Sequence, residues 1–179
     1  MNSTIAVLYK ILGGKLGTLA IITIVANLTV SNLPTIAQES NFGKISLSTA
    51  NPVGRLSGST GGSISLPAII SNMDYRNNRC LGFGDSKPDH ILTLEQNFPS
   101  LSIQVTSGAD TTLVVQGSDG IVRCGDDTGA QKDASIVDTN WKAGVYRIWV
   151  GSAAPGTQRD YRLTIQPVTP QPFPFTVQF

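Results

Sequence analysis

The sequence has 179 residues, enough for one domain with a substantial hydrophobic core but too few for two large domains. Its 13 basic and 12 acidic residues nearly balance, and without Lys10 and Lys15 in the N-terminal segment 11 basic residues face 12 acidic ones. A chain with so little net charge and no basic stripe gives no electrostatic reason to expect a nucleic-acid partner. The charged fraction of 14% and the 18 glycines favour an all-β protein over a helical one.

The N-terminal segment has the order of a secretory signal peptide. Two lysines precede an apolar run of 15 residues, Leu16–Val30, and Pro34 with several small residues follows it. The run is short of the roughly 20 apolar residues that a membrane-spanning helix needs. We therefore predict a signal peptide over residues 1–37, cleaved near Ala37, and a mature protein that is periplasmic or secreted and no longer contacts the membrane. An uncleaved N-terminal anchor is the alternative.

Export changes how the two cysteines, Cys80 and Cys124, are interpreted. In an oxidising compartment two cysteines are more often paired than free. A bridge between them would close a loop of 43 intervening residues, and the loop-entropy model gives such a bridge about 3–4 kcal/mol. The cysteines have neither CxxC spacing nor an adjacent histidine, which a metal site would favour. We predict a disulfide.

Composition divides the chain after residue 37 into three zones. Residues 38–63 are rich in Ser, Gly, Asn and Thr and end in GRLSGSTGGS, so we predict a flexible leader there. Residues 64–166 form the predicted domain. Residues 167–179, PVTPQPFPFTVQF, contain four prolines that favour extended backbone. The apolar residues near their end lie two positions apart, as along a strand laid on the domain or bound to a partner.

Apolar and polar residues alternate along much of the predicted domain, which is the period of a half-buried β-strand. The clearest runs are Leu101–Val105, Leu113–Val115, Tyr146–Val150 and Tyr161–Ile165, and we expect further strands at Ile64–Ile70, Arg79–Gly82 and His90–Leu94. Glycine-bearing turns separate the runs, and Asp119-Gly120 predicts a tight hairpin. About eight or nine short strands without an amphipathic helix predict an all-β fold, a two-sheet antiparallel β-sandwich of jelly-roll-like form.

The order of several motifs resembles a known family. The segment CLGFGDSKPDHILTL, which begins at Cys80, is followed by LSIQVTSGADTTLVVQGSDGIVRCGDD, NWKAGVYRIWVGS and DYRLTI. Together they resemble the bacterial pre-peptidase C-terminal (PPC) domain and its secreted relatives over about residues 80–165. The resemblance implies a jelly-roll-like sandwich that assists secretion, targeting or substrate attachment, and some relatives bind calcium or protein fibres. No catalytic domain precedes the module in this sequence, so we expect a stand-alone member.

Aspartates gather around the second cysteine. Asp126 and Asp127 are adjacent, Asp110 lies upstream and Asp138 downstream. Calcium takes about six to eight oxygen ligands, which loops between strands can supply, although the spacing here is not that of an EF-hand. These four aspartates are the candidate calcium ligands. Aspartates beside glycine also form turns by accepting backbone hydrogen bonds, and this alternative stays open.

The tryptophans suggest a second candidate surface. Trp149 shares one face of its predicted strand with Arg147. If the next strand pairs with it antiparallel, Arg162 lies beside them, and an aromatic ring flanked by guanidinium groups can stack on a sugar or a peptide. The alternative is packing within the sheet or against the Phe-rich tail. We expect Trp141 to fill one end of the sandwich.

Catalytic motifs are weak. A Ser-His-Asp arrangement would need the single histidine, His90, which stands at the expected start of a strand. The GSTGGS segment lies in the predicted leader and has no strand-to-helix turn around it. No zinc motif, phosphate loop or nucleotide fingerprint occurs.

The sequence therefore predicts a non-catalytic binding or structural module of the cell envelope or secreted fraction. Its partner is an unidentified protein or polysaccharide, and calcium is the one cofactor that the sequence suggests. The alternative is a secreted hydrolase, or an accessory or inhibitory domain of a protease.

Overall fold

The structure is a computed structural model, and it describes residues 39–127 and 132–168. The predicted signal peptide and nearly all of the Pro/Phe-rich tail lie outside the described residues, so those two interpretations stay predictions. Within the described part of the chain, no helix is long and apolar enough to cross a membrane.

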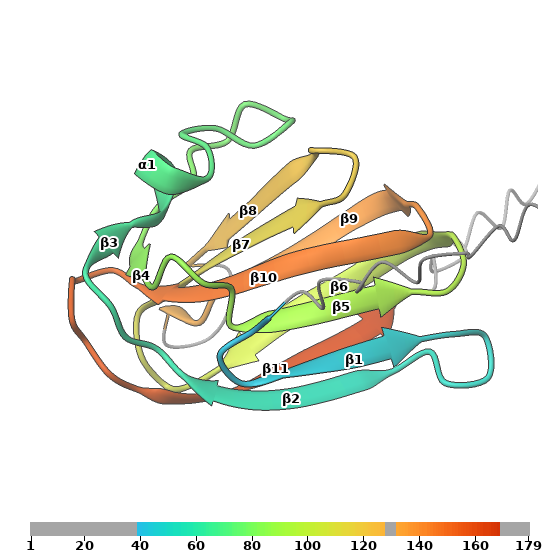
Figure 1. The fold of residues 1–179 in the computed structure, drawn as a ribbon, viewed down its shortest axis with the longest axis horizontal. Coiled ribbons are helices and arrows are strands. Elements are labelled where there is room, and N and C mark those ends of the chain that lie inside the picture. The colour runs from blue at the N-terminus through green and yellow to red at the C-terminus, as the bar shows by residue number, and fades with distance from the viewer. Residues whose placement is uncertain (1–38, 128–131, 169–179) are drawn as a thin grey trace, which may run out of the picture. The chain divides into compact units, whose positions relative to one another are not determined.

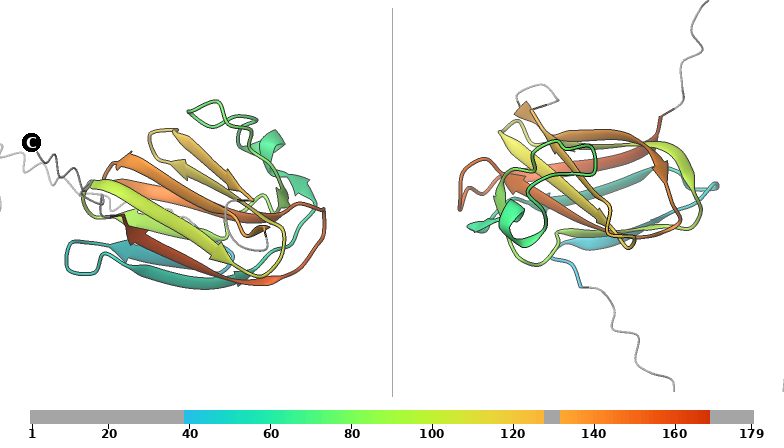
Figure 2. Two further views of the ribbon diagram at one scale, coloured as in Figure 1. Left: turned by 180° about the vertical axis from the view of Figure 1, so that it is seen from behind. Right: turned by 90° about the horizontal axis from the view of Figure 1, so that it is seen from above.

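Two β-sheets packed face to face make up the described part of the chain (Figures 1 and 2). The order in sheet A is β1 (Gly43–Leu47), β5 (His90–Leu94), β10 (Gly144–Ser152), β7 (Thr111–Gly117) and β8 (Val122–Asp126), with β4 (Phe83–Gly84) and β3 (Ile64–Ser65) joined at one end of β10. The order in sheet B is β2 (Gly54–Ser59), β11 (Asp160–Pro167), β6 (Phe98–Thr106) and β9 (Ser135–Trp141). The predicted all-β, two-sheet sandwich is confirmed. The pairing of β1 with β5 is parallel, whereas the other described strand pairs are antiparallel.

The predicted hairpin joins β7 to β8. Gly120 has a φ of 81°, a left-handed conformation that glycine adopts without strain. The Asp119 carboxylate accepts a hydrogen bond from the Ile121 amide at 3.0 Å. The strands then pair antiparallel, with Val114 opposite Cys124. Local turn chemistry thus accounts for the position of β8 at the edge of sheet A.

The core between the sheets consists of the inward-facing residues of each alternating strand. Leu101, Ile103 and Val105 of β6 are fully buried against Ile148 of β10 and its neighbours. Burying one such side chain stabilises a fold by about 1.5–3 kcal/mol. Trp141 is also fully buried, as expected, and its indole Nε1 donates to the Asp138 carbonyl at 3.0 Å.

A smaller apolar cluster lies on the outer face of sheet A, under a segment that we call the flap, residues 64–82. The flap contains β3, the one-turn helix α1 (Leu66–Ile69) and the loop that follows it along β8 (Figures 1 and 2). Leu66 and Cys80 of the flap pack with residues of β7, β8 and β10. The strand predicted at Ile64–Ile70 is therefore wrong beyond β3, because a proline at the start of α1 favours a helical turn. The strand predicted at Arg79–Gly82 is also wrong: Arg79 forms an isolated bridge with Met73 inside the flap, and residues 80–82 form no strand.

The prediction of a flexible leader over residues 38–63 is also wrong, since β1 and β2 belong to it and add one strand to each sheet. Leu47 is fully buried in the core. The glycines of β2 allow close packing: a Cβ at Gly58 would collide with Tyr161, and one at Gly54 would meet Ile45 at 2.9 Å. The low apolar content of residues 38–63 therefore does not indicate flexibility, because the glycines of β2 let its backbone lie close to neighbouring side chains.

Candidate ligand-binding cleft

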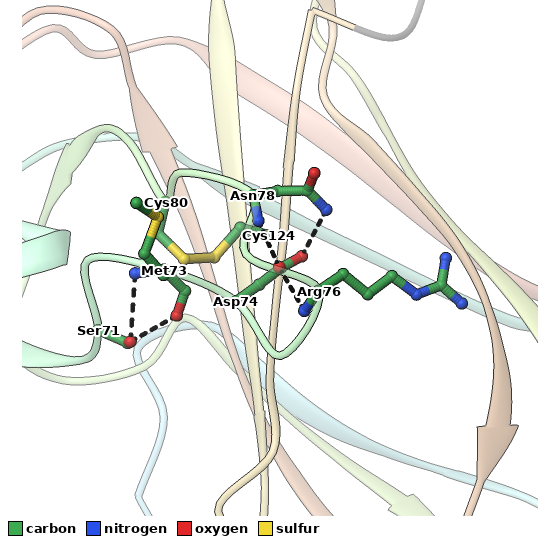
Figure 3. Close-up of a disulfide and its surroundings, with 7 residues drawn as sticks. All are labelled: Ser71, Met73, Asp74, Arg76, Asn78, Cys80 and Cys124. Carbon is green, nitrogen blue, oxygen red and sulfur yellow. Dashed lines mark hydrogen bonds between the residues drawn. A yellow bond between two sulfur atoms is a disulfide. The ribbon is translucent and has the colours of Figure 1, made fainter.

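A disulfide links the flap to sheet A. Cys80 and Cys124 of β8 are bonded, with their Cα atoms 5.2 Å apart, as the sequence predicted (Figure 3). Close by, the Tyr75 amide donates to the Val122 carbonyl at 3.0 Å. The flap is thus joined to the outer edge of β8 by one covalent bond and one backbone hydrogen bond.

A tight turn in the flap orients two side chains. The Asp74 carboxylate accepts hydrogen bonds from the backbone amides of Arg76 and Asn78, both at 2.8 Å, and from Nδ2 of Asn78 at 3.0 Å. Asn77 takes a left-handed φ of 65°, which asparagine tolerates better than most residues. Figure 3 shows this turn beside the disulfide, with the side chain of Arg76 extending away from it. The turn places Tyr75 and Arg76 over the open side of the sandwich.

The open side lies between β8, the edge of sheet A, and β9, the edge of sheet B. The two edges converge at Gly125, where a Cβ would collide with the Ser135 carbonyl, and a cleft of about 410 Å³ opens farther along. The flap, β8 and β9 line this β8–β9 cleft with Asp74, Tyr75, Arg76, Asn78, Arg123, Cys124, Ser135, Ile136, Val137 and Asp138.

A buried ion pair connects the two edges. Nε of Arg123 donates to Oδ2 of Asp138 at 2.6 Å, and each side chain is only 4% exposed. The Arg123 guanidinium also lies 4.1 Å from the ring centre of Trp141 and 5.2 Å from that of Tyr75. Guanidinium groups are attracted to aromatic faces, and more so when both are shielded from water.

The Asp138 carboxylate accepts several further hydrogen bonds. The Tyr75 hydroxyl lies 2.7 Å from both oxygens, the Thr139 amide donates at 2.8 Å, and Nη2 of Arg76 donates to Oδ1. Burial raises the pKa of Asp138, but the hydrogen bonds from Tyr75, Thr139 and Arg123 outweigh it, so the pKa lies below its ordinary value. Asp138 is therefore an ionised, fully hydrogen-bonded group that joins flap, β8 and β9.

The mouth of the cleft combines one positive charge with two apolar side chains. The Arg76 side chain is 50% exposed, Tyr75 is 46% exposed and Val137 is 60% exposed. Deeper in, Nη1 of Arg123 is buried and has no hydrogen-bond partner among the described residues. A buried donor without a partner costs about 1–3 kcal/mol, so this atom is a place where a ligand oxygen would stabilise the protein.

Sequence reasoning missed Tyr75, Arg76 and Arg123. Arg123 carried a weak signal, because a charged residue stands directly between Val122 and Cys124 in a predicted β-hairpin strand. Tyr75 and Arg76 carried none, since only the folded flap brings them to β9. Asp138 shares its parity along β9 with the buried Ile136, which places its side chain on the inner face.

Three of the four candidate calcium ligands come together. Asp110, Asp126 and Asp127 each offer a carboxylate oxygen, and these oxygens lie within 4.8 Å of one another. Burial raises the pKa of Asp126, and the neighbouring carboxylates raise it further. Nζ of Lys132 lies 3.3 Å from Asp110. Asp138 does not belong to this cluster, because its carboxylate is committed to the two arginines and Tyr75.

The predicted surface of Arg147, Trp149 and Arg162 is not formed. β10 pairs with β5, β7 and β4 in sheet A, whereas β11 pairs with β2 and β6 in sheet B, so Arg162 lies in the other sheet. Trp149 is 5% exposed and packs in the cluster under the flap. The alternative of packing within the sheet describes Trp149 correctly.

The single histidine lies in the interior. His90 is fully buried, and its Nε2 lies 2.9 Å from the Tyr161 hydroxyl. Burial lowers its pKa to about 4, so the imidazole is neutral near pH 7. A general base must reach the proton that it abstracts from a substrate, and a fully buried side chain does not offer this. The neighbouring Asp89 accepts a hydrogen bond from the Val150 amide at 2.7 Å.

Comparison with known proteins gives one weak similarity. No family model matches the chain, and no curated protein matches it. Among solved structures, the chain is similar to the pre-peptidase C-terminal domain of a collagenase from Bacillus anthracis, with a TM-score of 0.43 and 17% identity over 72% of this chain and 96% of that chain. Similarity at this level assigns no function, so the sandwich is established by the strands themselves and membership of the PPC family stays a prediction.

Proposed function

We propose that the protein is an exported, non-catalytic binding module of the cell envelope or secreted fraction, and that it binds its macromolecular partner at the β8–β9 cleft. One observation carries the proposal: a half-exposed Arg76 and an exposed Tyr75 are held over a buried ion pair by a turn next to a disulfide. Ordered side chains lose less conformational entropy on binding, so a rigid turn favours affinity.

The disulfide supports export, because such bonds persist in oxidising compartments and are rare in the cytosol. The basic-then-apolar order of the N-terminal segment supports it independently. The interior position of His90 supports a binding module over a hydrolase that depends on histidine.

The test is capture of a partner from the native envelope fraction by the mature protein and two variants. Arg76→Gln removes the accessible charge at the mouth of the cleft. Arg79→Gln is the matched control, because Arg79 is an exposed arginine of the same flap that does not line the cleft. We expect a partner that the wild type and Arg79→Gln retain and that Arg76→Gln loses. Equal retention by both variants, or no enriched partner with or without calcium, would contradict the proposal.

A further inference from the structure

We propose that the protein has a second binding site, for a neutral polysaccharide, in a hollow on sheet B where β2, β11 and β6 lie side by side (Figure 1). The hollow has a volume of about 810 Å³. It lies toward β2, the edge of sheet B opposite to β9, and shares no lining residue with the β8–β9 cleft. This inference goes beyond the proposed function, because it adds a second class of ligand and does not concern the first.

The hollow contains one cation and one anion that have no partner in the described part of the chain. Arg162 and Asp160 stand two positions apart on β11, so their side chains share its outer face, and both residues are exposed. Neither side chain makes a hydrogen bond or an ion pair within the described residues. A guanidinium group donates hydrogen bonds and a carboxylate accepts them, whereas a sugar hydroxyl does both. Neighbouring hydroxyls of one sugar ring can therefore bind to the two groups together, in charge-assisted hydrogen bonds.

An aromatic ring borders the same hollow. Phe42 is 46% exposed, although the ring centres of Tyr161 and His90 lie 6.4 Å and 6.0 Å from its own. Its backbone amide donates to the Asp89 carbonyl at 2.9 Å. Gly58 leaves the space that the ring needs, because a Cβ there would lie 2.8 Å from Phe42. A ring held in this way offers an apolar surface to the C–H face of a sugar, beside the few polar groups that orient a ligand.

The charge of the hollow favours a neutral ligand. Arg162 and Asp160 cancel, and the other residues that line the hollow carry no charge. It therefore gives no electrostatic preference for an anion or a cation. Ser57 and Thr106 lie opposite Arg162 on the two neighbouring strands, and their hydroxyls have no partner within the described residues. These groups suit a ligand that is rich in hydroxyls.

The backbone around the hollow favours a saccharide over a peptide. β11 is hydrogen-bonded to β2 on one side and to β6 on the other, so its backbone cannot pair with an added strand. Among the described residues that line the hollow, Phe42 is the one large apolar side chain that is exposed. The centre of a protein–protein interface usually buries several such side chains. Recognition at this site therefore depends on polar side chains and one ring.

Affinity electrophoresis tests the inference on the disulfide-bonded mature protein, in native gels with and without a dissolved polysaccharide. The probes are four neutral polymers (hydroxyethyl cellulose, laminarin, galactomannan and xyloglucan) and one acidic polymer, polygalacturonate. We expect at least one neutral polymer to retard the protein and polygalacturonate not to retard it. Arg162→Gln should weaken this binding about tenfold, because a hydrogen bond to a charged group contributes about that factor. Phe42→Leu, which removes the ring but keeps an apolar side chain, should weaken it about fivefold.

Arg55→Gln is the matched control and should bind as the wild type does. Arg55 is an exposed arginine on the same face of sheet B, two positions from Ser57, but it does not line the hollow. Both arginine variants lose the same charge, so a difference between them reports the hollow itself.

The other outcomes separate this inference from the proposed function. Retardation by none of the neutral polymers overturns the inference and leaves the proposed function standing, since that rests on Arg76. Retardation that survives both Arg162→Gln and Phe42→Leu places the polysaccharide elsewhere on the protein. Retardation by polygalacturonate alone replaces the neutral ligand with an acidic one. Loss of a captured protein partner in Arg162→Gln assigns the hollow to that partner, whereas capture that is independent of Arg76 overturns the proposed function itself.

Discussion

Arg123 of β8 and Asp138 of β9 form a buried ion pair of 2.6 Å between the two sheets. The pair stands beside the Cys80–Cys124 disulfide, which holds the flap on the same strand, β8. The ion pair thus joins the two sheets at the open side of the sandwich, and the disulfide holds the flap beside it. The ion pair also orders the residues at the mouth of the cleft, because Tyr75 and Arg76 both donate to Asp138.

Removal of the charge on Asp138 should destabilise the fold strongly. In Asp138→Asn the Arg123 guanidinium stays buried without a counter-ion, and breaking a buried pair in this way costs about 3–5 kcal/mol. Urea denaturation followed by tryptophan fluorescence measures the free energy of unfolding. The control is Asp160→Asn, which alters an exposed carboxylate and should change this free energy by less than about 0.5 kcal/mol. Equal stability of the two variants would mean that the pair is dispensable.

The disulfide should contribute stability mainly through the unfolded chain. The bridge closes a long loop, with a sequence separation of 44, so the double variant Cys80→Ala and Cys124→Ala should lose about 3–4 kcal/mol. Guanidinium denaturation of oxidised, reduced and double-variant protein measures this loss, and reduction should resemble the substitution. Alkylation of the unreduced protein followed by intact mass should find no labelled cysteine. Two labelled cysteines would refute the pairing.

The strands that could be predicted from the sequence are those whose signal is local. Leu101–Val105 and Tyr161–Ile165 alternate strictly, and each is half buried in a sheet as expected. In Tyr146–Val150 the buried Trp149 interrupts the alternation, and that strand is buried on both faces. β1 and β2 escaped prediction, because their place depends on contacts with β5 and β11, distant in sequence. The glycines of β2 suggested a flexible segment, but in the structure they allow β2 to pack closely against its neighbours.

In the candidate site, too, features with a local sequence signal were predicted and features that depend on distant contacts were not. The acidic cluster was predicted from adjacency in sequence, and Asp126 and Asp127 do lie together. Asp138 was assigned to it wrongly, because composition does not reveal which face of a strand a residue occupies. The neighbours of Trp149 were wrong for a related reason: the chain between β10 and β11 crosses from one sheet to the other, and no local pattern signals this.

Asp89 and His90 should have opposite effects on the pH dependence of stability. Burial raises the pKa of Asp89 from 3.8 to about 6, so its contribution stabilises the folded state at low pH and is lost as pH rises through about 6. Burial lowers the pKa of His90 from 6.5 to about 4, so its contribution is present above pH 6.5 and is lost as pH falls toward 4. Each amounts to about 3 kcal/mol, because one pKa unit corresponds to about 1.4 kcal/mol. The two nearly cancel in the wild type between pH 4 and 6.

Asp89→Asn should remove this balance. Asparagine can still accept the hydrogen bond from the Val150 amide, but it does not titrate. We expect the free energy of unfolding of the variant to fall, relative to the wild type, by about 3 kcal/mol between pH 6.5 and pH 4. Urea titrations at several pH values measure it. The control, His90→Gln, should show the opposite trend and gain stability as pH falls. Parallel profiles for Asp89→Asn and the wild type would contradict the prediction.

Calcium should stabilise the protein through Asp110, Asp126 and Asp127, whose carboxylate oxygens approach within 4.8 Å of one another. A ligand that binds only the folded state raises the unfolding free energy by about 2.7 kcal/mol at a hundredfold excess over its dissociation constant. Thermal unfolding in calcium and in chelator measures the effect. Asp127→Asn should abolish it, whereas the destabilised Asp138→Asn should keep it, because Asp138 lies outside the cluster.

The stabilisation by calcium should weaken in acid. Burial and the neighbouring carboxylates raise the pKa of Asp126, so protons compete with the ion for this group. Identical midpoints in calcium and chelator would leave these aspartates with the role of building the turn.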